Sequence, residues 1–310
     1  MVTFLFNLLK ATRPRQWIKN SALLGGLLFS GLLDNPDAIT KALYAFLIFC
    51  ATSSATYLLN DVFDIERDRL HPFKSKRPIA SGKISVPMAT AIALAIIIAI
   101  LPMAYNLSPA FFVAVILYLL LQLLYSAYLK SVILLDVMTI AAGFVLRVYA
   151  GIWAINAHLN VWFLLTVISF SLFLAIGKRR SELTLMQSHA SKTRETLLHY
   201  PENLLDILTA MFANATWLAY AFFTFLQPPI YARPRLIGIF SELNLPFTQA
   251  KYLMATIPIV IYAVMRYLYI IYEKKEGESP ERVLLTDKPL LFTVILYSLT
   301  TIAIIYFLGS

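Results

Sequence analysis

The sequence predicts an all-α membrane protein, a bundle of about nine transmembrane helices. Hydrophobic residues make up 59% of the 310 positions and charged residues only 14%, whereas a soluble domain carries about 25% charged residues. The charges are also concentrated between long apolar stretches, which is the pattern of a chain whose solvent is lipid. We therefore expect one integral-membrane domain over residues 1–310, with little chain left outside the membrane.

Apolar stretches of about 17–25 residues, the length that crosses a bilayer, occur at nine places along the chain. The first of them is short and needs help from the residues before it. The predicted spans are roughly 20–33, 41–60, 86–105, 109–129, 132–154, 160–177, 204–226, 248–271 and 289–308.

The basic residues predict the orientation of this bundle. With the N-terminus inside, the cytoplasmic segments hold 20 of the 26 Lys and Arg residues, and cytoplasmic segments of membrane proteins carry such an excess. We expect a cytoplasmic N-terminus and an outer C-terminus in the cell (inner) membrane. The net charge of +9 then arises mainly from the Lys and Arg residues that orient the protein in the membrane, and it requires no nucleic-acid partner. These cytoplasmic segments are 1–19, 61–85, the surroundings of residue 130, 178–203 and 272–288.

The N-terminal segment, residues 1–19, is predicted to be amphipathic. It carries Lys10, Arg13, Arg15 and Lys19 beside apolar residues. Segments of this kind lie on an anionic membrane face.

Acidic side chains recur at helical spacing after the second predicted span. Asn60, Asp64 and Asp68 are four residues apart, and Asp61 lies three before Asp64, so one face of a helix leaving the membrane would carry them all. Carboxylates stacked in this way repel one another unless a cation lies between them. Mg²⁺ commonly takes one or two carboxylates together with phosphate oxygens. We predict that all four residues bind Mg²⁺ and that the three aspartates are catalytic; the alternative is a solvated acidic helix end.

Basic residues follow on the same predicted face of the membrane. Lys74 and Arg77 lie in a loop bounded by prolines and suit an anion held between metal and cations. Lys178 and Arg179 begin the segment after the sixth predicted span, where they either anchor the helix end or bind phosphate. Glu182 either pairs with Lys178 or reaches a metal.

Arg147 is a charge inside the fifth predicted span, eleven residues after Asp136. A charge in the bilayer costs at least ~2.5 kcal/mol and marks a functional site by default. We expect Arg147 to face a polar cavity, either in a structural ion pair or as a contact to an anionic substrate. Tyr125 and Lys130, at the end of the fourth predicted span, are further candidates for lining the site.

The residues from Asn60 to Asp68 resemble the NxxxDxxxD signature of the UbiA superfamily of intramembrane prenyltransferases. The resemblance covers essentially the whole chain and implies nine spans with a cytoplasmic active face. One branch is especially similar. It transfers a 5-phosphoribosyl group from 5-phosphoribosyl diphosphate to a polyprenyl (decaprenyl-type) phosphate in the membrane and releases diphosphate. The segments that carry this similarity are RPRQWIKN (13–20), NDVFDIERDRLHPFKSKRPIASG (60–82), DVMTIAAGFVLRVYAG (136–151), GKRRSEL (177–183) and RY…YEKKEGESPERVLLTDKPL (266–290).

A departure from the wider superfamily favours this branch. Ordinary members hold a prenyl diphosphate with a second motif, DxxxD, after the sixth span, whereas residues 178–203 of this chain contain no aspartate. The alternative with the same fold is a conventional prenyltransferase that moves an isoprenoid from a prenyl diphosphate onto an aromatic or lipid-soluble acceptor, with Glu182 replacing part of that motif.

An alternative from another class is a transporter with Asp64 and Arg147 as ion or proton sites. Transporters often show Gly- or Pro-broken spans at corresponding places in two halves, and the sequence shows no such pairing. The sequence is also compatible with a homo-oligomer.

Overall fold

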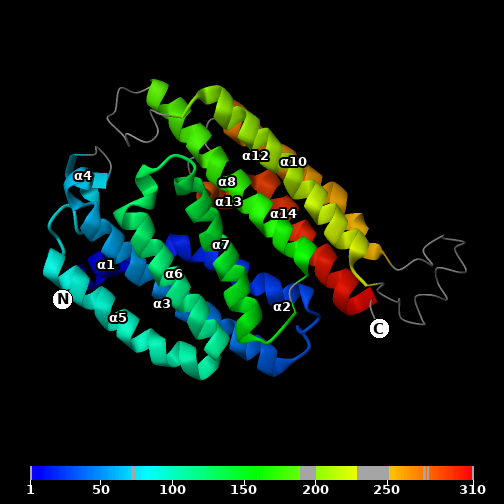
Figure 1. Ribbon diagram of the computed structural model, residues 1–310, viewed down its shortest axis with the longest axis horizontal. Helices are drawn as coiled ribbons and strands as arrows, with labels where there is room; N and C mark the ends of the chain where they lie inside the picture. Colours follow the sequence, from blue (N-terminus) through cyan, green and yellow to red (C-terminus); the bar gives the residue numbers. More distant parts are fainter. Residues whose placement is uncertain are drawn as a thin grey trace, which may run out of the picture. The chain divides into compact units, whose positions relative to one another are not determined.

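In the computed structural model in Figure 1, all the regular elements of the part of the chain that it describes, residues 2–70, 74–158, 160–188, 200–228, 251–274, 277 and 279–308, are helices. The predicted all-α fold class is therefore confirmed. In chain order the elements are α1 (Val2–Ala11), the 3₁₀ helix η1 (Pro14–Leu24), α2 (Gly25–Phe29), α3 (Pro36–Phe63), α4 (Ile65–Leu70), η2 (Lys74–Lys76), α5 (Val86–Leu107), α6 (Pro109–Ala127), η3 (Leu129–Ser131), α7 (Leu135–Ala154), α8 (Val161–Ser188), α10 (Glu202–Leu226), η4 (Tyr252–Thr256), α12 (Ile257–Tyr269), the π-helix η5 (Ile270–Lys274), α13 (Pro280–Thr286), α14 (Lys288–Ile302) and the π-helix η6 (Ala303–Leu308).

Among the described residues, eight helical segments are long and apolar enough to cross a membrane, and each coincides with one of the last eight predicted spans, with ends that differ by up to seven residues. The chain is a multi-pass membrane protein. The eight segments are Pro36–Phe63, Val86–Leu107, Pro109–Ala127, Leu135–Ala154, Val161–Thr184, Glu202–Leu226, Tyr252–Lys274 and Lys288–Leu308.

The first predicted span, 20–33, does not form one long helix. It is divided between η1 and the five-residue α2, and Gly31 follows with a positive φ of 72°. Asn20 is fully buried and donates to Ser53 Oγ at 3.1 Å, which draws this segment against α3. The count of nine spans and the sidedness of the two termini stay predictions.

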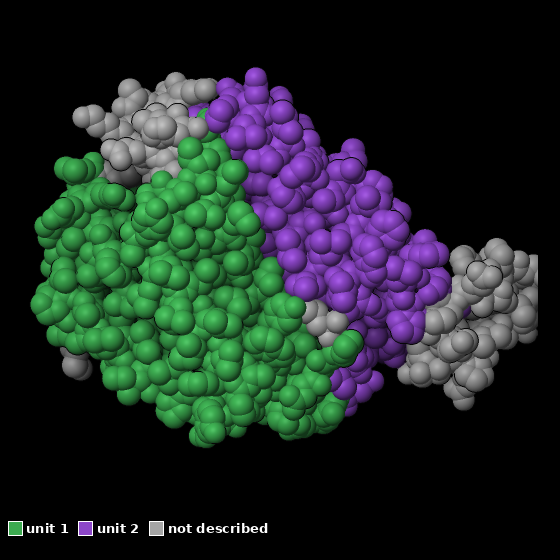
Figure 2. All heavy atoms as spheres, viewed as in Figure 1, with its two compact units in different colours: residues 1–27, 35–158, 186–200 green, residues 28–34, 159–185, 201–310 purple. Residues whose placement is uncertain are grey.

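The chain groups into two compact units, coloured in Figure 2. Unit 1 comprises Met1–Leu27, Asn35–His158 and Met186–Tyr200, and unit 2 comprises Leu28–Asp34, Leu159–Leu185 and Pro201–Ser310. The prediction of a single domain concerns independent folding, which this grouping does not measure, and it stays a prediction.

In unit 1 the long helix α3 packs against η1, α5, α6 and α7 (Figure 1). Phe49 of α3 is fully buried, with its ring centroid 5.1 Å from that of Tyr118 and 6.1 Å from that of Phe111. In unit 2 a hydrophobic core cluster is formed by side chains from α8, α10, α12, η5, α13 and α14. Phe173 of α8 there meets Tyr267 of α12 edge to face at 5.4 Å.

The N-terminal segment is more than a surface anchor. Helix α1 exposes Leu5, Phe6 and Leu9, as expected of an amphipathic segment. Beyond it the chain turns at Arg13, whose φ is 53°, and Trp17 donates to Ser54 Oγ on α3 at 3.0 Å. The basic end of the predicted surface segment is thus packed on the bundle.

Helix α8 extends into the predicted cytoplasmic segment 178–203, of which residues 189–199 lie outside the described part of the chain. It continues to Ser188, so the basic cluster that starts at Lys178 lies on a helix. The residues there are good helix formers, and Glu182 lies within 3.8 Å of Lys178 and 2.5 Å of Arg179 on the same helix surface. Such pairs at spacings of three and four support a helix.

Gly151 marks the closest approach of two elements in unit 1. A Cβ atom there would lie 1.9 Å from the carbonyl oxygen of Leu23 in η1. Small residues permit such contacts between helix backbones in membranes. Glycine is therefore required at this position, whereas the Cβ of an alanine at Gly143 on the same helix would meet its nearest neighbours at 3.5 Å.

We expect Gly151→Ala to lower the stability of the detergent-solubilised protein by about 3 kcal/mol or more, because backbone atoms cannot yield to the added methyl as a side chain would. Gly143→Ala is the matched control. It should change stability by less than about 1 kcal/mol, since alanine favours a helix. Thermal unfolding followed by circular dichroism measures both, and equal midpoints for the two variants would contradict the close contact.

Candidate functional site

The acidic cluster lies where α3 ends. Asp61 belongs to the last turn of α3, Asp64 is its C-cap with φ −95° and ψ 8°, and Asp68 belongs to the short helix α4. The predicted continuous helix is thus interrupted at Asp64, although backbone bonds of 2.9 Å from Asp64 to Asn60 and 2.8 Å from Asp68 to Asp64 keep the helical spacing. The four predicted metal ligands form two pairs with different partners, and their role as metal ligands stays a prediction.

The first pair, Asp61 and Asp68, is held by arginines. Arg77 Nη1 lies 3.2 Å from Asp61 Oδ1 and also pairs with Asp68, and Arg13 pairs with Asp61. Asp61 is 2% exposed and Asp68 4%. Buried carboxylates require such partners, so Arg77, predicted as a phosphate ligand, also neutralises the acidic cluster.

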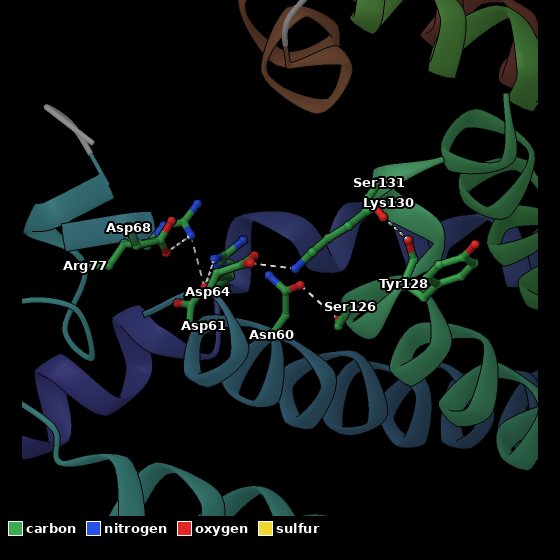
Figure 3. A network of polar contacts seen from close by, with 10 residues as sticks. Asn60, Asp61, Asp64, Asp68, Arg77, Ser126, Tyr128, Lys130 and Ser131 are labelled. Atoms are coloured by element: carbon green, nitrogen blue, oxygen red, sulfur yellow. Dashed lines mark hydrogen bonds and ion pairs between the residues drawn. The ribbon is translucent and has the colours of Figure 1, made fainter. Parts of the chain in front are cut away.

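The second pair faces the end of α6 (Figure 3). Lys130 Nζ lies 2.5 Å from Asp64 Oδ1, and Ser126 donates to Asn60 Oδ1 at 2.9 Å. Lys130 is buried, and its ammonium approaches Asp64 from the side opposite to Arg77. Lys130, predicted as a candidate for lining the site, thus lies beside the acidic cluster, and its role in binding substrate stays a prediction.

A cavity of about 290 Å³ adjoins this second pair. Ligand pockets commonly enclose about 300–1,000 Å³, so this cavity suits a phosphorylated head group better than a long lipid chain. Its walls combine both signs of charge. The lining residues are Phe63, Asp64, Glu66, Arg67, Ser126, Ala127 and Lys130.

The donor set suits Mg²⁺ bound together with a phosphorylated ligand. Within the described ranges no three His, Cys, Asp or Glu side chains gather to hold a metal by themselves. Mg²⁺ usually binds one or two carboxylates plus substrate phosphates instead of an all-protein cage. Of the four predicted ligands, Asp64 lines the cavity and Asn60 is bonded to Ser126 of its wall.

Arg147 is the centre of a buried network in unit 1. Its three nitrogens donate to Asn20 Oδ1 at 2.9 Å, Gly143 O at 2.9 Å and Tyr118 Oη at 2.7 Å, and the side chain is only 5% exposed. All three acceptors are neutral, and they join η1, α6 and α7. The geometry therefore favours a structural role for Arg147. The sequence suggested an ion pair, but the partners in the structure are the dipoles of neutral groups.

Asp136 has a different partner. It is 1% exposed and accepts a hydrogen bond of 2.7 Å from the hydroxyl of Tyr200. No sequence motif pointed to Tyr200.

The basic cluster on α8 is largely neutralised within unit 2. Glu182 pairs with Arg179 at 2.5 Å and with Lys178 at 3.8 Å, which confirms the expected Lys178 pair. Arg180 pairs with Asp206 at 2.5 Å and with Glu202 at 2.6 Å. The cluster is thus less cationic than its sequence implies, and substrate binding by Lys178, Arg179 and Glu182 stays a prediction.

Asp287 joins three elements of unit 2. Its carboxylate accepts two bonds from Arg266 at 2.8 and 3.0 Å, one from Lys274 at 2.8 Å and one from the backbone of Leu290 at 3.0 Å, and it caps α14. The bonds from Arg266 and Lys274 hold the pKa of Asp287 well below its ordinary value, although burial opposes them. Charged residues that lie far apart in segment 266–290 therefore meet in the folded chain, where Arg266 and Lys274 pair with Asp287.

Lys74 and Tyr125 were also predicted to line the site. Lys74 begins η2, where its carbonyl accepts the Arg77 N–H at 2.9 Å, and Tyr125 is half-buried on α6 beside Ser126. Their roles stay predictions. Sequence reasoning missed Arg13 and Ser126 as parts of the cluster. Arg13 had been assigned to the membrane surface, and a lone serine near a helix end carries no signal.

The chain as a whole is similar to a known protein family and to named proteins. The UbiA prenyltransferase family profile matches residues 21–286. The decaprenyl-phosphate phosphoribosyltransferase of Mycolicibacterium smegmatis is 35% identical over 305 residues, which cover 97% of this chain and 92% of that protein. The protein of the same name from Corynebacterium glutamicum is 34% identical over 91% of this chain and 82% of its own.

The fold also matches a solved structure. A UbiA homolog from Archaeoglobus fulgidus, bound to GPP and Mg²⁺, superposes with a TM-score of 0.68, at 22% identity, over 96% of this chain and 99% of that one. At this identity the likeness establishes the fold.

We expect Arg147→Lys to destabilise the protein by about 2–3 kcal/mol, because one ammonium cannot bridge three separate acceptors in a buried site. Arg15→Lys, at an exposed position of η1, is the matched control and should have no effect on the thermal midpoint. An unchanged midpoint for Arg147→Lys, combined with a raised substrate KM, would instead favour the anion contact.

We expect Asp287 to make stability depend on acid pH. Its folded pKa lies below the unfolded value of about 3.9, so its stabilising contribution is complete above that value and is lost as pH falls through the folded pKa. Asp287→Asn should cost ~2 kcal/mol at pH 7, a value discounted for the partly exposed Arg266 and Lys274. It should also flatten the fall of the thermal midpoint below about pH 4. The exposed Asp37→Asn is the control; the idea fails if both variants keep the wild-type pH profile.

Proposed function

This chain belongs to the UbiA prenyltransferase family, and we propose that it transfers a 5-phosphoribosyl group from 5-phosphoribosyl diphosphate to a polyprenyl phosphate, releasing diphosphate. The observation that carries the proposal is similarity along 97% of the chain to a decaprenyl-phosphate phosphoribosyltransferase. The site described above supports it. A cavity of head-group size borders both a carboxylate and a lysine, which are the groups that a metal-bound diphosphate needs.

The chemistry that a bound Mg²⁺ supplies is neutralisation of the leaving diphosphate. Asp64 and Asn60 would hold the metal beside the cavity. Asp61 and Asp68, also predicted as ligands, are engaged by Arg13 and Arg77 in this structure. We propose that these two carboxylates chiefly orient the arginines toward the phosphates.

The cations would hold and align the two anionic substrates. Lys130 lines the cavity, and Arg77 is a guanidinium with spare donors for phosphate oxygens. The polyprenyl phosphate is already ionised at neutral pH, so its oxygen can attack C1 of the ribose without a strong general base. Positive charge develops on the ribose as diphosphate leaves. The protein then contributes position and electrostatics.

We propose that this site opens on the cytoplasmic side of the inner membrane. A phosphorylated sugar donor is soluble and cannot cross hydrocarbon, and the excess of Lys and Arg in the segments around the acidic cluster supports that side. The lipid tail would remain in the bilayer.

We expect purified protein with Mg²⁺, a polyprenyl phosphate and 5-phosphoribosyl diphosphate to release diphosphate and to form a lipid product of the corresponding mass. EDTA should abolish the release and added Mg²⁺ should restore it. Asp64→Asn should lower kcat/KM on the order of 100-fold, since a charged ligand of the metal that neutralises the leaving diphosphate is lost. Diphosphate release and mass spectrometry measure these outcomes.

Asp37→Asn is the control for Asp64→Asn. Asp37 lies on the same helix, is exposed and pairs with Lys41 at 2.7 Å, so its loss should leave activity unchanged. No turnover with several polyprenyl phosphates, together with product from a prenyl diphosphate and an aromatic acceptor, would assign the protein to the conventional prenyltransferases instead.

A further inference from the structure

The turn between α6 and α7 carries Lys130. This turn, residues 128–134, contains η3 and is closed by bonds from Ser131 N and Oγ to the carbonyl of Tyr128, at 3.0 and 2.6 Å (Figure 3). Lys130 reaches Asp64 from it at 2.5 Å. The position of the ammonium therefore depends on the conformation of a seven-residue turn.

Leu134 ends this turn in a strained conformation. Its φ is 66° and its ψ is −39°, which lies outside even the left-handed helical region that non-glycine residues occasionally adopt. Such residues cost about 1–3 kcal/mol each and persist only where surrounding contacts fix them. A specific contact must therefore hold Leu134.

Tyr200 provides that contact. The N–H of Leu134 donates to the Tyr200 hydroxyl at 2.7 Å, and the same hydroxyl donates to Asp136 Oδ1 at 2.7 Å. Tyr200 is 3% exposed and Asp136 1%. One buried hydroxyl thus accepts from the strained residue and donates to the first turn of α7.

This contact lies away from the cavity. The residues that line the cavity come from the end of α3, from α4, from the end of α6 and from η3, and Tyr200 is not one of them. Any effect of Tyr200 on the reaction must therefore pass through the turn.

We propose that Tyr200 is a positioning residue for Lys130. Its hydroxyl stabilises the strained conformation of Leu134, and this conformation presents the Lys130 ammonium to Asp64 and to the diphosphate of the substrate. The inference rests on the proposed function, in which Lys130 binds a phosphate. Loss of the hydroxyl alone would release the strain and let the turn relax, so that Lys130 no longer has one fixed position.

Tyr200→Phe removes only the hydroxyl. We expect it to raise the KM for 5-phosphoribosyl diphosphate about 10-fold, since misplacing a substrate-binding group has effects of this order, with a smaller change in kcat. Glycine adopts a positive φ at little cost. Leu134→Gly should therefore restore the KM of Tyr200→Phe to within about 3-fold of the wild-type value, a rescue that a general loss of folding would not show.

A double-mutant cycle tests the route through Lys130. In a Lys130→Ala background, Tyr200→Phe should cause no further rise in KM, because the residue that it positions is gone. The matched control is Tyr220→Phe, which removes another buried hydroxyl, bonded to Thr256 at 2.6 Å, and should leave the KM unchanged. A further 10-fold rise in the Lys130→Ala background, or an equal rise in Tyr220→Phe, would overturn the proposal.

Two outcomes separate this inference from the proposed function. If the wild-type protein turns over only a prenyl diphosphate, the proposed function fails and the same cycle is run with that substrate. If Tyr200→Phe unfolds, the comparison of Leu134→Gly with Leu134→Gly/Tyr200→Phe measures the same coupling. Equal KM values for that pair support the positioning role, and unequal values sink it.

Discussion

Hydrocarbon cannot solvate a charge, and the architecture of this protein follows from that constraint. Each buried charged group described above is held by an opposite charge or by fixed dipoles. Arg147 shows the second solution, with three neutral acceptors around a guanidinium that is 5% exposed. Such a network costs desolvation, but it joins helices that apolar packing alone would leave free to slide.

The acidic cluster shows the first solution. Its carboxylates are neutralised by Arg13, Arg77 and Lys130. These cations keep a repulsive group of charges together in a largely buried place. The same cations have the chemistry to bind phosphates. A metal-bound diphosphate would therefore compete with the carboxylates for these cations.

Charge pairing also lowers the net positive charge of the basic cluster on α8. Three successive cations suggest a strongly basic patch, yet Glu182, Glu202 and Asp206 neutralise most of them. A phosphate-binding role for Lys178 or Arg179 therefore has to compete with carboxylates that are already in place.

The sequence by itself determined the fold class, eight of the nine predicted spans and the acidic motif, because these depend on local hydrophobicity and helical spacing. It did not determine which cation meets which carboxylate. Arg13 lies 48 residues from Asp61 and Lys130 lies 66 residues from Asp64, and no periodicity in the chain encodes contacts over such distances. The division of the acidic residues into two pairs, the neutral surroundings of Arg147 and the strain of Leu134 under Tyr200 were decided by tertiary packing. They arise where distant elements meet, and only the folded chain brings those elements together.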